Sequence, residues 1–404
     1  MQFGAPQKEA EQYSMKEFQY YNPTKVVFGA GEYKQLGKEV RNYGSSALLI
    51  EQEGPLEEMG VFSRAIGYME SCGIRVFELK GITSNPKLSK IEEGILAVKE
   101  NQIEVIVAVG GGSSIDTAKA ISFGAPANTD VWDFFSRKRQ IEKALPVVAV
   151  STISATGAET SCHCVVTNDR SSDCTKWQKW AVHDAFAFPK TAMIDPELLV
   201  TVPKGLTAAG MADTISHVIE GYFDGVPDNP VSDRIGEGIV MTVLENDGVL
   251  EDLGNTSKRG ALSWAATLAM SGLQDCGRSN AGFPAHWIQH AVGAMTDSSH
   301  GEGLAVINPA WLEFENQKNP EKFVQFTERV FGIEREKGMS DAEYGKLGIK
   351  ALKDRFKSWG LPGTLRELGV KEEMLEEIAD NVLRAPESYV FEKAHILEVL
   401  RSCY

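Results

Sequence analysis

Four of the chain's seven histidines, together with one aspartate, are spaced so that they could hold a single divalent metal ion. Asp213 and His217 lie four residues apart in an apolar stretch with helical periodicity, which places their Cβ atoms about 5–6 Å apart on one helix face. His286 and His290 repeat this spacing, and His300 follows after a polar break. One carboxylate with two or three imidazoles suits iron, zinc, cobalt or manganese and leaves a position for substrate. Spacing alone leaves open which histidines take part, and helical pairs of this kind also arise without a ligand.

Length and charge limit the functions that this chain could have. Its 404 residues suffice for two or three domains, and its net charge of −15 disfavours nucleic acid and anionic membranes as partners. No apolar run reaches the roughly 18–20 residues that cross a bilayer, and the N-terminus lacks the apolar core of a signal peptide. The six cysteines are scattered and form no Cys-x-x-Cys pair. These features predict a cytoplasmic protein with reduced thiols.

Short apolar runs alternate with amphipathic helical patterns in the first half of the chain, which is typical of a doubly wound parallel sheet. After Pro203 the strand signals vanish and long helical patterns continue to the end. We therefore expect a polar extension at 1–17, an α/β nucleotide-binding domain at 18–200 and an all-helical metal-binding domain at 201–404. The expected strands lie at 25–28, 47–50, 75–79, 105–109, 146–150 and 191–195, and the expected helices at 90–99, 115–123, 208–223, 233–245, 258–270 and 284–295.

Two loops that follow expected strands could meet a nucleotide. In the first, Gly110–Gly112 would let the backbone approach a phosphate, and the helix that follows would offer free N–H groups and the positive end of its dipole. Ser113 and Ser114 add hydroxyl donors there. The loop matches neither of the standard glycine motifs, so a tight turn that binds nothing is the alternative. The second loop, 151–159, is rich in small hydroxyl residues that could meet a ribose or nicotinamide, or simply cap a helix.

Taken together, these segments resemble the iron-containing (group III) alcohol dehydrogenase family, most closely its butanol dehydrogenase-like branch. The resemblance covers nearly the whole chain, from Asn22 to the C-terminal helices. It implies a doubly wound α/β dinucleotide-binding domain, an all-helical metal domain and a cleft between them, the dehydroquinate synthase-like architecture. The segments that carry it are Gly110 to Lys119, Asp213-x-x-x-His217, and His286-x-x-x-His290 with His300 to Gly303.

The resemblance also implies which side chains hold the metal. The family's ligands correspond to Asp213, His217, His286 and His300, with Fe(II) expected and Zn or Mn as alternatives. His290 matches a histidine that lies near the nicotinamide and is not a ligand. Because an imidazole titrates near neutrality, we expect His290 to relay a proton to solvent.

A second set of positions matches the family's cofactor contacts. Asn85 belongs to an Asn-Pro turn near the cofactor, and Lys179 aligns with a lysine that contacts it. Glu53 follows the second strand, where a carboxylate would accept a hydrogen bond from a ribose 2′-OH and repel a 2′-phosphate, so we expect NAD(H) rather than NADP(H). The chain departs from the family at 155–159, where Gly-Thr-Gly-Ser-Glu is usual. The expected cofactor-binding residues are Glu53, Asn85, Gly111, Gly112, Ser113, Ser114, Asp116, Thr152, Ile153, Thr156 and Lys179.

The function implied is hydride transfer between a nicotinamide and a short primary alcohol or its aldehyde, with the metal as Lewis acid. His163, Arg278 and Asn280 could hold a polar or anionic tail such as that of sulfoacetaldehyde, although Arg278 could instead pair with surface acids. A metal-dependent lyase or hydrolase of the same superfamily and a ligand-binding protein with a structural metal are the alternatives. We expect a small-molecule substrate and a homodimer or larger homo-oligomer, with no nucleic-acid or membrane partner.

Overall fold

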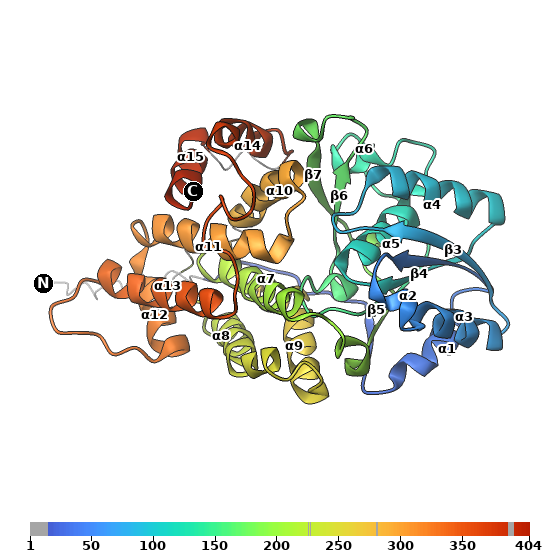
Figure 1. Ribbon diagram of the computed structural model, residues 1–404, viewed down its shortest axis with the longest axis horizontal. Coiled ribbons are helices and arrows are strands. Elements are labelled where there is room, and N and C mark those ends of the chain that lie inside the picture. The colour runs from blue at the N-terminus through green and yellow to red at the C-terminus, as the bar shows by residue number, and fades with distance from the viewer. Residues whose placement is uncertain (1–14, 225, 227, 280–281, 387–391) are drawn as a thin grey trace, which may run out of the picture.

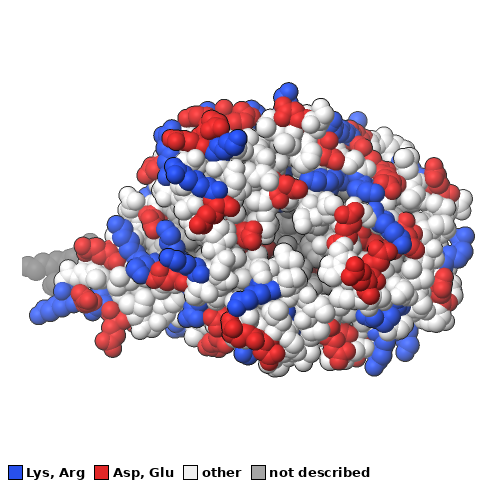
Figure 2. Space-filling view, viewed as in Figure 1, with Lys and Arg blue, Asp and Glu red and all other residues white. Residues whose placement is uncertain are grey.

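The chain folds into two halves that lie side by side (Figure 1). The computed structural model describes residues 15–224, 226, 228–279, 282–386 and 392–404, so most of the expected N-terminal extension and Asn280 lie outside the described residues. At the start of the described chain, the Lys16 N–H donates to the carbonyl oxygen of Gly277 at 3.0 Å. No helix among the described residues is long and apolar enough to cross a membrane. Over the described residues of the face shown in Figure 2, acidic and basic side chains are interspersed.

A six-stranded sheet forms the centre of the first half, and all its neighbouring strands run parallel. The expected strands are confirmed, and their continuous apolar runs are explained by burial on both faces of the sheet. The doubly wound parallel fold class is therefore confirmed. In spatial order the strands are β1 (Lys25–Phe28), β8 (Thr191–Ile194), β5 (Val147–Ser151), β4 (Val105–Gly110), β2 (Ser46–Gln52) and β3 (Arg75–Ile82).

Helices cover both faces of this sheet because side chains alternate along each strand. Leu48 and Ile50 of β2 pack in one apolar cluster with Ile91 and Ile115, which come from two helices, whereas Leu49 packs on the opposite face. The helices on the first face are α4 (Leu88–Asn101) and α5 (Gly112–Gly124), those on the second are α1 (Leu36–Arg41) and α3 (Val61–Ser71), and the short helices are α2 (Pro55–Glu58) and α6 (Trp132–Phe135).

An antiparallel hairpin, β6 (His163–Asn168) and β7 (Gln178–His183), was not predicted from the sequence. It lies beside the sheet and carries two of the expected site residues, His163 and Lys179. Lys119 of α5 is fully buried, and its Nζ donates to the carbonyl oxygens of Ser161 at 2.9 Å and His163 at 2.7 Å. This buried ammonium group fixes the start of the hairpin to the helix that follows the glycine loop.

The second half contains helices and no strand among its described residues, as the sequence predicts. Its first helix, α7, is buried along nearly its whole length and lies at the centre of the bundle. The gap between β8 and α7 contains residue 200, where we expect the domain boundary. The helices are α7 (Lys204–Tyr222), α8 (Pro230–Glu245), α9 (Thr256–Ala269), α10 (Pro284–Thr296), α11 (His300–Asn316), α12 (Pro320–Phe331), α13 (Asp341–Ser358), α14 (Leu375–Leu383) and α15 (Lys393–Ser402).

The second expected cofactor loop, 151–159, joins the two halves. The Thr214 hydroxyl of α7 donates to the Ala155 carbonyl oxygen at 3.4 Å, and the Thr267 hydroxyl of α9 donates to the buried Glu159 carboxylate at 2.6 Å. Asn22 reaches across the same junction, since its Nδ2 donates to Thr160 of one half and to Ser271 of the other. The loop after β5 is thus packed directly on the helix that carries Asp213.

The close approach of α11 to α7 yields a prediction about stability. A Cβ atom at Gly301 would lie 2.0 Å from the Ala209 carbonyl oxygen, whereas one at Gly205, near the start of α7, would meet nothing within 4 Å. Gly301→Ala should therefore lower the free energy of unfolding by about 1–3 kcal/mol. The control Gly205→Ala should raise it by up to about 1 kcal/mol through helix propensity. Urea unfolding measures both, and a Gly301→Ala variant as stable as the parent would refute the close helix contact.

Candidate metal centre and cofactor cleft

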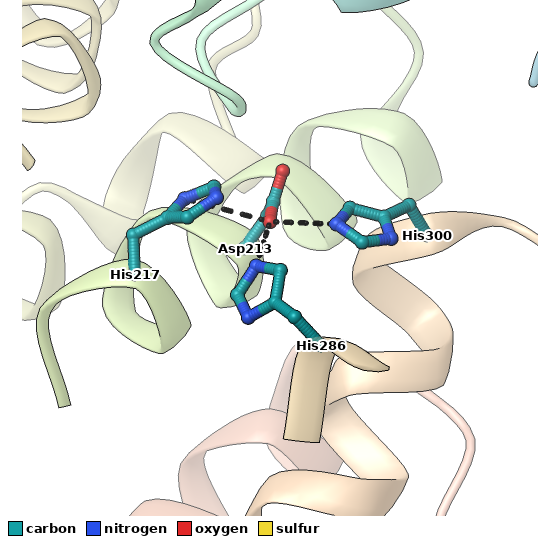
Figure 3. Close-up of side chains that lie close together, drawn as sticks. All are labelled: Asp213, His217, His286 and His300. Atoms are coloured by element: carbon teal, nitrogen blue, oxygen red, sulfur yellow. Dashed lines mark ion pairs between the residues drawn. The ribbon is translucent and has the colours of Figure 1, made fainter. Parts of the chain in front are cut away.

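Asp213, His217, His286 and His300 converge on one point, and each offers a ligand atom within 4.8 Å of the other three (Figure 3). Asp213 Oδ1 lies 3.6 Å from His217 Nδ1, 3.8 Å from His286 Nε2 and 3.6 Å from His300 Nε2. Four donors at about 2.0–2.2 Å from one ion would stand roughly 3.3–3.6 Å apart in a tetrahedral arrangement. The separations are therefore close to those that one bound ion requires. The side chains come from the starts of α10 and α11 and from the middle of α7.

The chemistry of these donors also fits a cation. Among the described residues, Asp213 Oδ1, His217 Nδ1 and His286 Nε2 are buried without a hydrogen-bond partner. Leaving such atoms unpaired typically costs about 1–3 kcal/mol each, so an arrangement that turns them all to one point needs a compensating charge. Burial raises the pKa of Asp213 to about 7 and lowers that of His217 well below its usual value. A neutral imidazole is the form that binds metal.

Two further side chains orient the ligands and were not singled out from the sequence. Glu220 meets His286 Nδ1 through Oε1, while its Oε2 accepts the backbone N–H groups of Ala285 at 2.7 Å and His286 at 3.2 Å. Gln289 Oε1 meets His300 Nδ1 in the same way. An oxygen on Nδ1 fixes the ring proton there and leaves Nε2 as the ligand atom. Each lies three residues after a ligand, at the helical spacing that could have identified them.

His290 lies beside the four ligands rather than among them. Its ring centre is 5.6 Å from that of His300 and 6.4 Å from that of His286. Its Nδ1 is buried without a hydrogen-bond partner in the described part of the chain. Burial, reinforced by the charge of Lys179, lowers the pKa of His290 well below its usual value. The ring is therefore neutral at pH 7, which differs from the expectation that it titrates near neutrality.

The glycine loop lies where β4 meets β2, the point at which the order of strands reverses. Ligands of doubly wound sheets bind at this place. The Gly111 N–H donates to Gln52 Oε1 of β2 at 2.8 Å, and Ser114 Oγ is buried without a partner among the described residues. Ser113 is the more exposed of the two serines.

The two expected cofactor loops touch each other. A Cβ atom at Gly111 would lie 2.8 Å from Ile153 Cγ2, and one at Gly112 would lie 2.6 Å from Thr156 Oγ1. Both positions therefore favour glycine, because a Cβ atom at either one would force the Ile153 or Thr156 side chain of the loop after β5 to shift. The Thr152 N–H also donates to the Gly110 carbonyl oxygen at 3.0 Å.

The remaining expected cofactor residues range from buried to exposed; they are Asp116, Lys179, Asn85 and Glu53. Asp116 Oδ2 accepts the Val165 N–H at 3.0 Å, whereas its Oδ1 is buried without a hydrogen-bond partner among the described residues. Lys179 is buried and its Nζ donates to Asn85 Oδ1 at 2.8 Å. Burial lowers the pKa of Lys179 to about 8. Glu53 is exposed in the loop after β2, close to Gly81 and one residue after Gln52.

The expected substrate residues separate into two places. His163 lies near the metal ligands across Phe283, whose ring centre is 6.3 Å from that of His163 and 5.4 Å from that of His286. Phe283 was not predicted from the sequence. Arg278 is buried, with its Nη1 on Asp233 at 3.1 Å and its Nε on the Gln274 carbonyl oxygen at 2.7 Å. The expected contact of Arg278 with substrate is therefore not retained, because its guanidinium group is buried against Asp233 and the Gln274 carbonyl oxygen.

Comparisons with known proteins agree with this arrangement. Residues 23–196 match the family model of the iron-containing alcohol dehydrogenases, and residues 207–404 match that of the C-terminal part of the Fe-containing alcohol dehydrogenase family. The probable NADH-dependent butanol dehydrogenase 1 of Bacillus subtilis (strain 168) is 36% identical over 370 residues, covering 91% of this chain and 94% of that protein. An NADPH-dependent aldehyde reductase of Escherichia coli (strain K12) is 31% identical over 88% of this chain and 90% of its own length.

A solved structure shares the whole architecture. The crystal structure of an NADH-dependent butanol dehydrogenase A from Thermotoga maritima superposes with a TM-score of 0.90 at 36% identity. The match covers 96% of this chain and 99% of the other. Both halves and their relative arrangement are therefore common to the two proteins.

The convergence of four side chains predicts how metal content responds to mutation. His217→Ala and His300→Ala should each lose most of the bound metal, since the remaining donors hold an ion poorly against water. His395→Ala is the control, because His395 lies on α15 with its ring 5.2 Å from Phe314. Elemental analysis of the purified variants measures the result. Full metal content in either ligand variant would show that the wrong residues have been assigned.

The contact between Glu220 and His286 predicts a partial loss of metal affinity in a Glu220 variant. In Glu220→Gln, the amide oxygen would keep the two backbone N–H groups, so the amide NH₂ would face His286 Nδ1. Because this NH₂ is a donor, Nδ1 must accept, and the ring proton moves to Nε2. Metal affinity should fall by about 10- to 100-fold, as measured by competition with a chelator. Glu315→Gln is the control, since the Glu315 carboxylate pairs with Lys318 at 3.2 Å. Unchanged affinity in Glu220→Gln would mean that Glu220 does not set the tautomer.

Proposed function

The chain belongs to the iron-containing alcohol dehydrogenase family, and on that premise we propose a specific cofactor, metal site and substrate class for it. The protein is an oxidoreductase that interconverts an alcohol and its aldehyde with a nicotinamide cofactor. The proposal is that it prefers NAD(H), uses one divalent ion and acts on short, neutral primary alcohols and aldehydes. The observation that carries it is the largely buried meeting of one carboxylate and three imidazoles.

The proposed metal site consists of Asp213, His217, His286 and His300. A divalent ion bound there would supply Lewis-acid stabilisation of negative charge on the substrate oxygen. Iron, zinc and manganese all suit this donor set, and the family's description favours Fe(II). The protein's own contribution is orientation, because Glu220 and the amide of Gln289 hold two imidazoles with their Nε2 atoms turned inward.

His290 is the proposed proton carrier between the substrate and solvent. The position of its ring beside His300 and its neutral state support this role, because a neutral imidazole can accept a proton at an unoccupied nitrogen. Its buried Nδ1 is the candidate atom. The neighbouring Lys179 would limit how long the ring stays protonated, because two positive charges in a buried site repel each other.

The proposed cofactor site follows the loops at the carboxyl ends of β2, β4 and β5. The start of α5, at Gly112, would receive the pyrophosphate on its free backbone N–H groups. In the form described, Gln52 Oε1 occupies the Gly111 N–H, so a phosphate there would have to replace this amide oxygen. Glu53 supports the preference for NAD(H), as does the NADH dependence in the name of the Bacillus subtilis relative. The NADPH-dependent relative of Escherichia coli makes this preference a point to be measured.

The proposed substrate is a short aldehyde or alcohol without an anionic tail. Phe283 and His163 would flank its chain, and both rings are uncharged, since burial lowers the pKa of His163 to about 3. Arg278, the cation expected to hold an anionic tail, is paired with Asp233. Family membership also favours a dehydrogenase over the lyase or hydrolase alternative and over a structural metal.

We further propose a homo-oligomer that works in the cytoplasm. The edge strand β1 ends in Phe28, which is 45% exposed and meets the 43% exposed Trp264 at 6.1 Å between ring centres. An exposed aromatic pair at a sheet edge is a suitable surface for a second copy of the chain. All six cysteines are free thiols, which supports a reducing compartment. Light scattering would measure the oligomeric state.

The proposed activity predicts the outcome of one assay. Purified protein loaded with Fe(II) should oxidise NADH in the presence of butanal and should prefer it to succinic semialdehyde and sulfoacetaldehyde in kcat/KM. A His217→Ala protein is the control for adventitious activity. Absence of NADH and NADPH oxidation with every aldehyde tested would refute the function, and a preference for the anionic aldehydes would refute the neutral substrate class.

The position of Glu53 predicts how cofactor preference changes. The unmodified enzyme should favour NADH over NADPH in kcat/KM, and Glu53→Ser should narrow the ratio by roughly tenfold, because one carboxylate–phosphate repulsion is removed. Glu58→Ser is a matched control, since Glu58 is an exposed acid at the end of the neighbouring α2. A parent enzyme that favours NADPH, or equal shifts in both variants, would contradict the assignment of Glu53.

A further inference from the structure

Asp297 ties the metal half of the molecule to the nucleotide half. It lies immediately after α10, in the turn between His290 and His300. Its Oδ1 accepts a hydrogen bond from Asn85 Nδ2 at 2.8 Å and lies 3.5 Å from Lys87 Nζ. Both partners belong to the segment that joins β3 to α4 in the sheet half. One carboxylate thus links the turn that presents His300 to the Asn-Pro turn of the other half.

The left-handed backbone conformation at Asp297 indicates that its side chain has a role of its own. Its φ of 55° and ψ of 24° lie in the left-handed region that closes many helices. Glycine is the usual residue at such a position because a Cβ atom adds strain there, and aspartate and asparagine are tolerated better than most residues. An aspartate here accepts some strain that glycine would avoid, and in return it contributes the contact with Asn85.

The contact continues from Asn85 to a buried lysine. Lys179 Nζ donates to Asn85 Oδ1 at 2.8 Å, while the Nδ2 of the same amide donates to Asp297. An ammonium group at one end and a carboxylate at the other permit only one orientation of the amide. Hydrogen bonds in such a chain polarise and strengthen one another. Without Asp297, the Asn85 Nδ2 group would lose this acceptor, and only the Lys179 end of the amide would still be held.

The chain of contacts ends beside the metal ligands. Lys179 lies on β7, which packs against α10, and α10 carries His286 and His290. Lys179 and Asn85 are both nearly inaccessible to solvent, at 6% and 7% exposure, so their positions depend on protein partners. Asp297 itself is largely exposed, at 61% of its side chain, so it can be replaced without opening a cavity.

We propose that Asp297 is a positioning residue for cofactor binding. It holds the Asn85 amide in the orientation in which Asn85 Oδ1 accepts from Lys179, and it fixes the turn before His300 against the nucleotide half. The inference rests on the proposed function and on the family resemblance, which implies that Asn85 lies near the nicotinamide cofactor and that Lys179 contacts it. It assigns no direct contact between Asp297 and the substrate or cofactor.

The test is Asp297→Gly, which separates positioning from stability. Glycine relieves the left-handed backbone, so the unfolding midpoint should stay the same or rise. Loss of the carboxylate should raise the Kd for NADH about fivefold, the factor that corresponds to one ordinary hydrogen bond, and should raise the KM for NADH with a smaller change in kcat. Fluorescence titration, steady-state kinetics and urea unfolding give the three readouts, and elemental analysis should find the parent's metal content.

Two further variants test whether a change in NADH affinity comes from the loss of the Asp297 side chain. Asp297→Asn keeps both an acceptor oxygen and tolerance of the left-handed backbone, so it should restore most of the NADH affinity. Gln102→Gly is the matched control, because Gln102 closes α4 with a φ of 52° in the same left-handed region and is exposed. It should gain stability in the same way and bind NADH like the parent.

The outcomes separate this inference from the proposed function. If Asp297→Gly binds NADH with the parent's affinity and KM, Asp297 has no positioning role. If it loses affinity only together with stability, or if Gln102→Gly loses affinity equally, the role is merely structural and the inference is wrong. If the parent neither binds NADH nor oxidises it with any aldehyde, the proposed function fails first and the inference with it.

Discussion

The structure depends on placing a carboxylate and three imidazoles together in a largely buried site. Asp213 Oδ1 and two imidazole nitrogens have no hydrogen-bond partner among the described residues, and each such atom is unfavourable unless a cation compensates it. Three helices must meet closely to create this arrangement. The approach of α11 to α7 at Gly301 leaves no room for a side chain. The glycine next to His300 therefore allows the close helix packing that brings His300 to the other ligands.

The second constraint is the position of the metal centre relative to the glycine loop and the loop after β5. The loop after β5 contacts α7 through the Ala155 carbonyl oxygen on one side and the glycine loop through Ile153 and Thr156 on the other. A displacement of either half would therefore separate the start of α5 from the ligands on α7. The hydrogen bond between Asp297 and Asn85 adds another link between the two halves, at the C-terminal end of α10.

Much of this could be predicted from the sequence for a physical reason. Strands buried on both faces appear as continuous apolar runs, and α7 and α10 combine apolar periodicity with histidines four residues apart. The hairpin that carries His163 and Lys179 lacked such a run, since it lies outside the sheet and mixes polar and apolar residues. Spacing could not choose between His286 and His290, because both occupy the same helix face.

Side chains whose roles depend on distant partners were the ones missed. The sequence left Arg278 open between a substrate contact and a pairing with surface acids, and it could not identify the buried partner Asp233, which is separated from Arg278 by 45 positions in the chain. Glu220 is recognisable only once His286, 66 positions away, is known to turn its Nδ1 toward it. Phe283 owes its place between His163 and the ligands to a left-handed backbone at the start of α10, which no local pattern signalled.

Anomalous diffraction from crystals of the metal-loaded protein tests the central claim most directly. Data collected on either side of the iron and zinc absorption edges would identify the ion and locate it. The account predicts one peak about 2.0–2.3 Å from donor atoms of Asp213, His217, His286 and His300, and beyond bonding distance of His290. The account would be contradicted by a peak that His290 coordinates in place of one of these ligands, or by no peak where the four side chains meet.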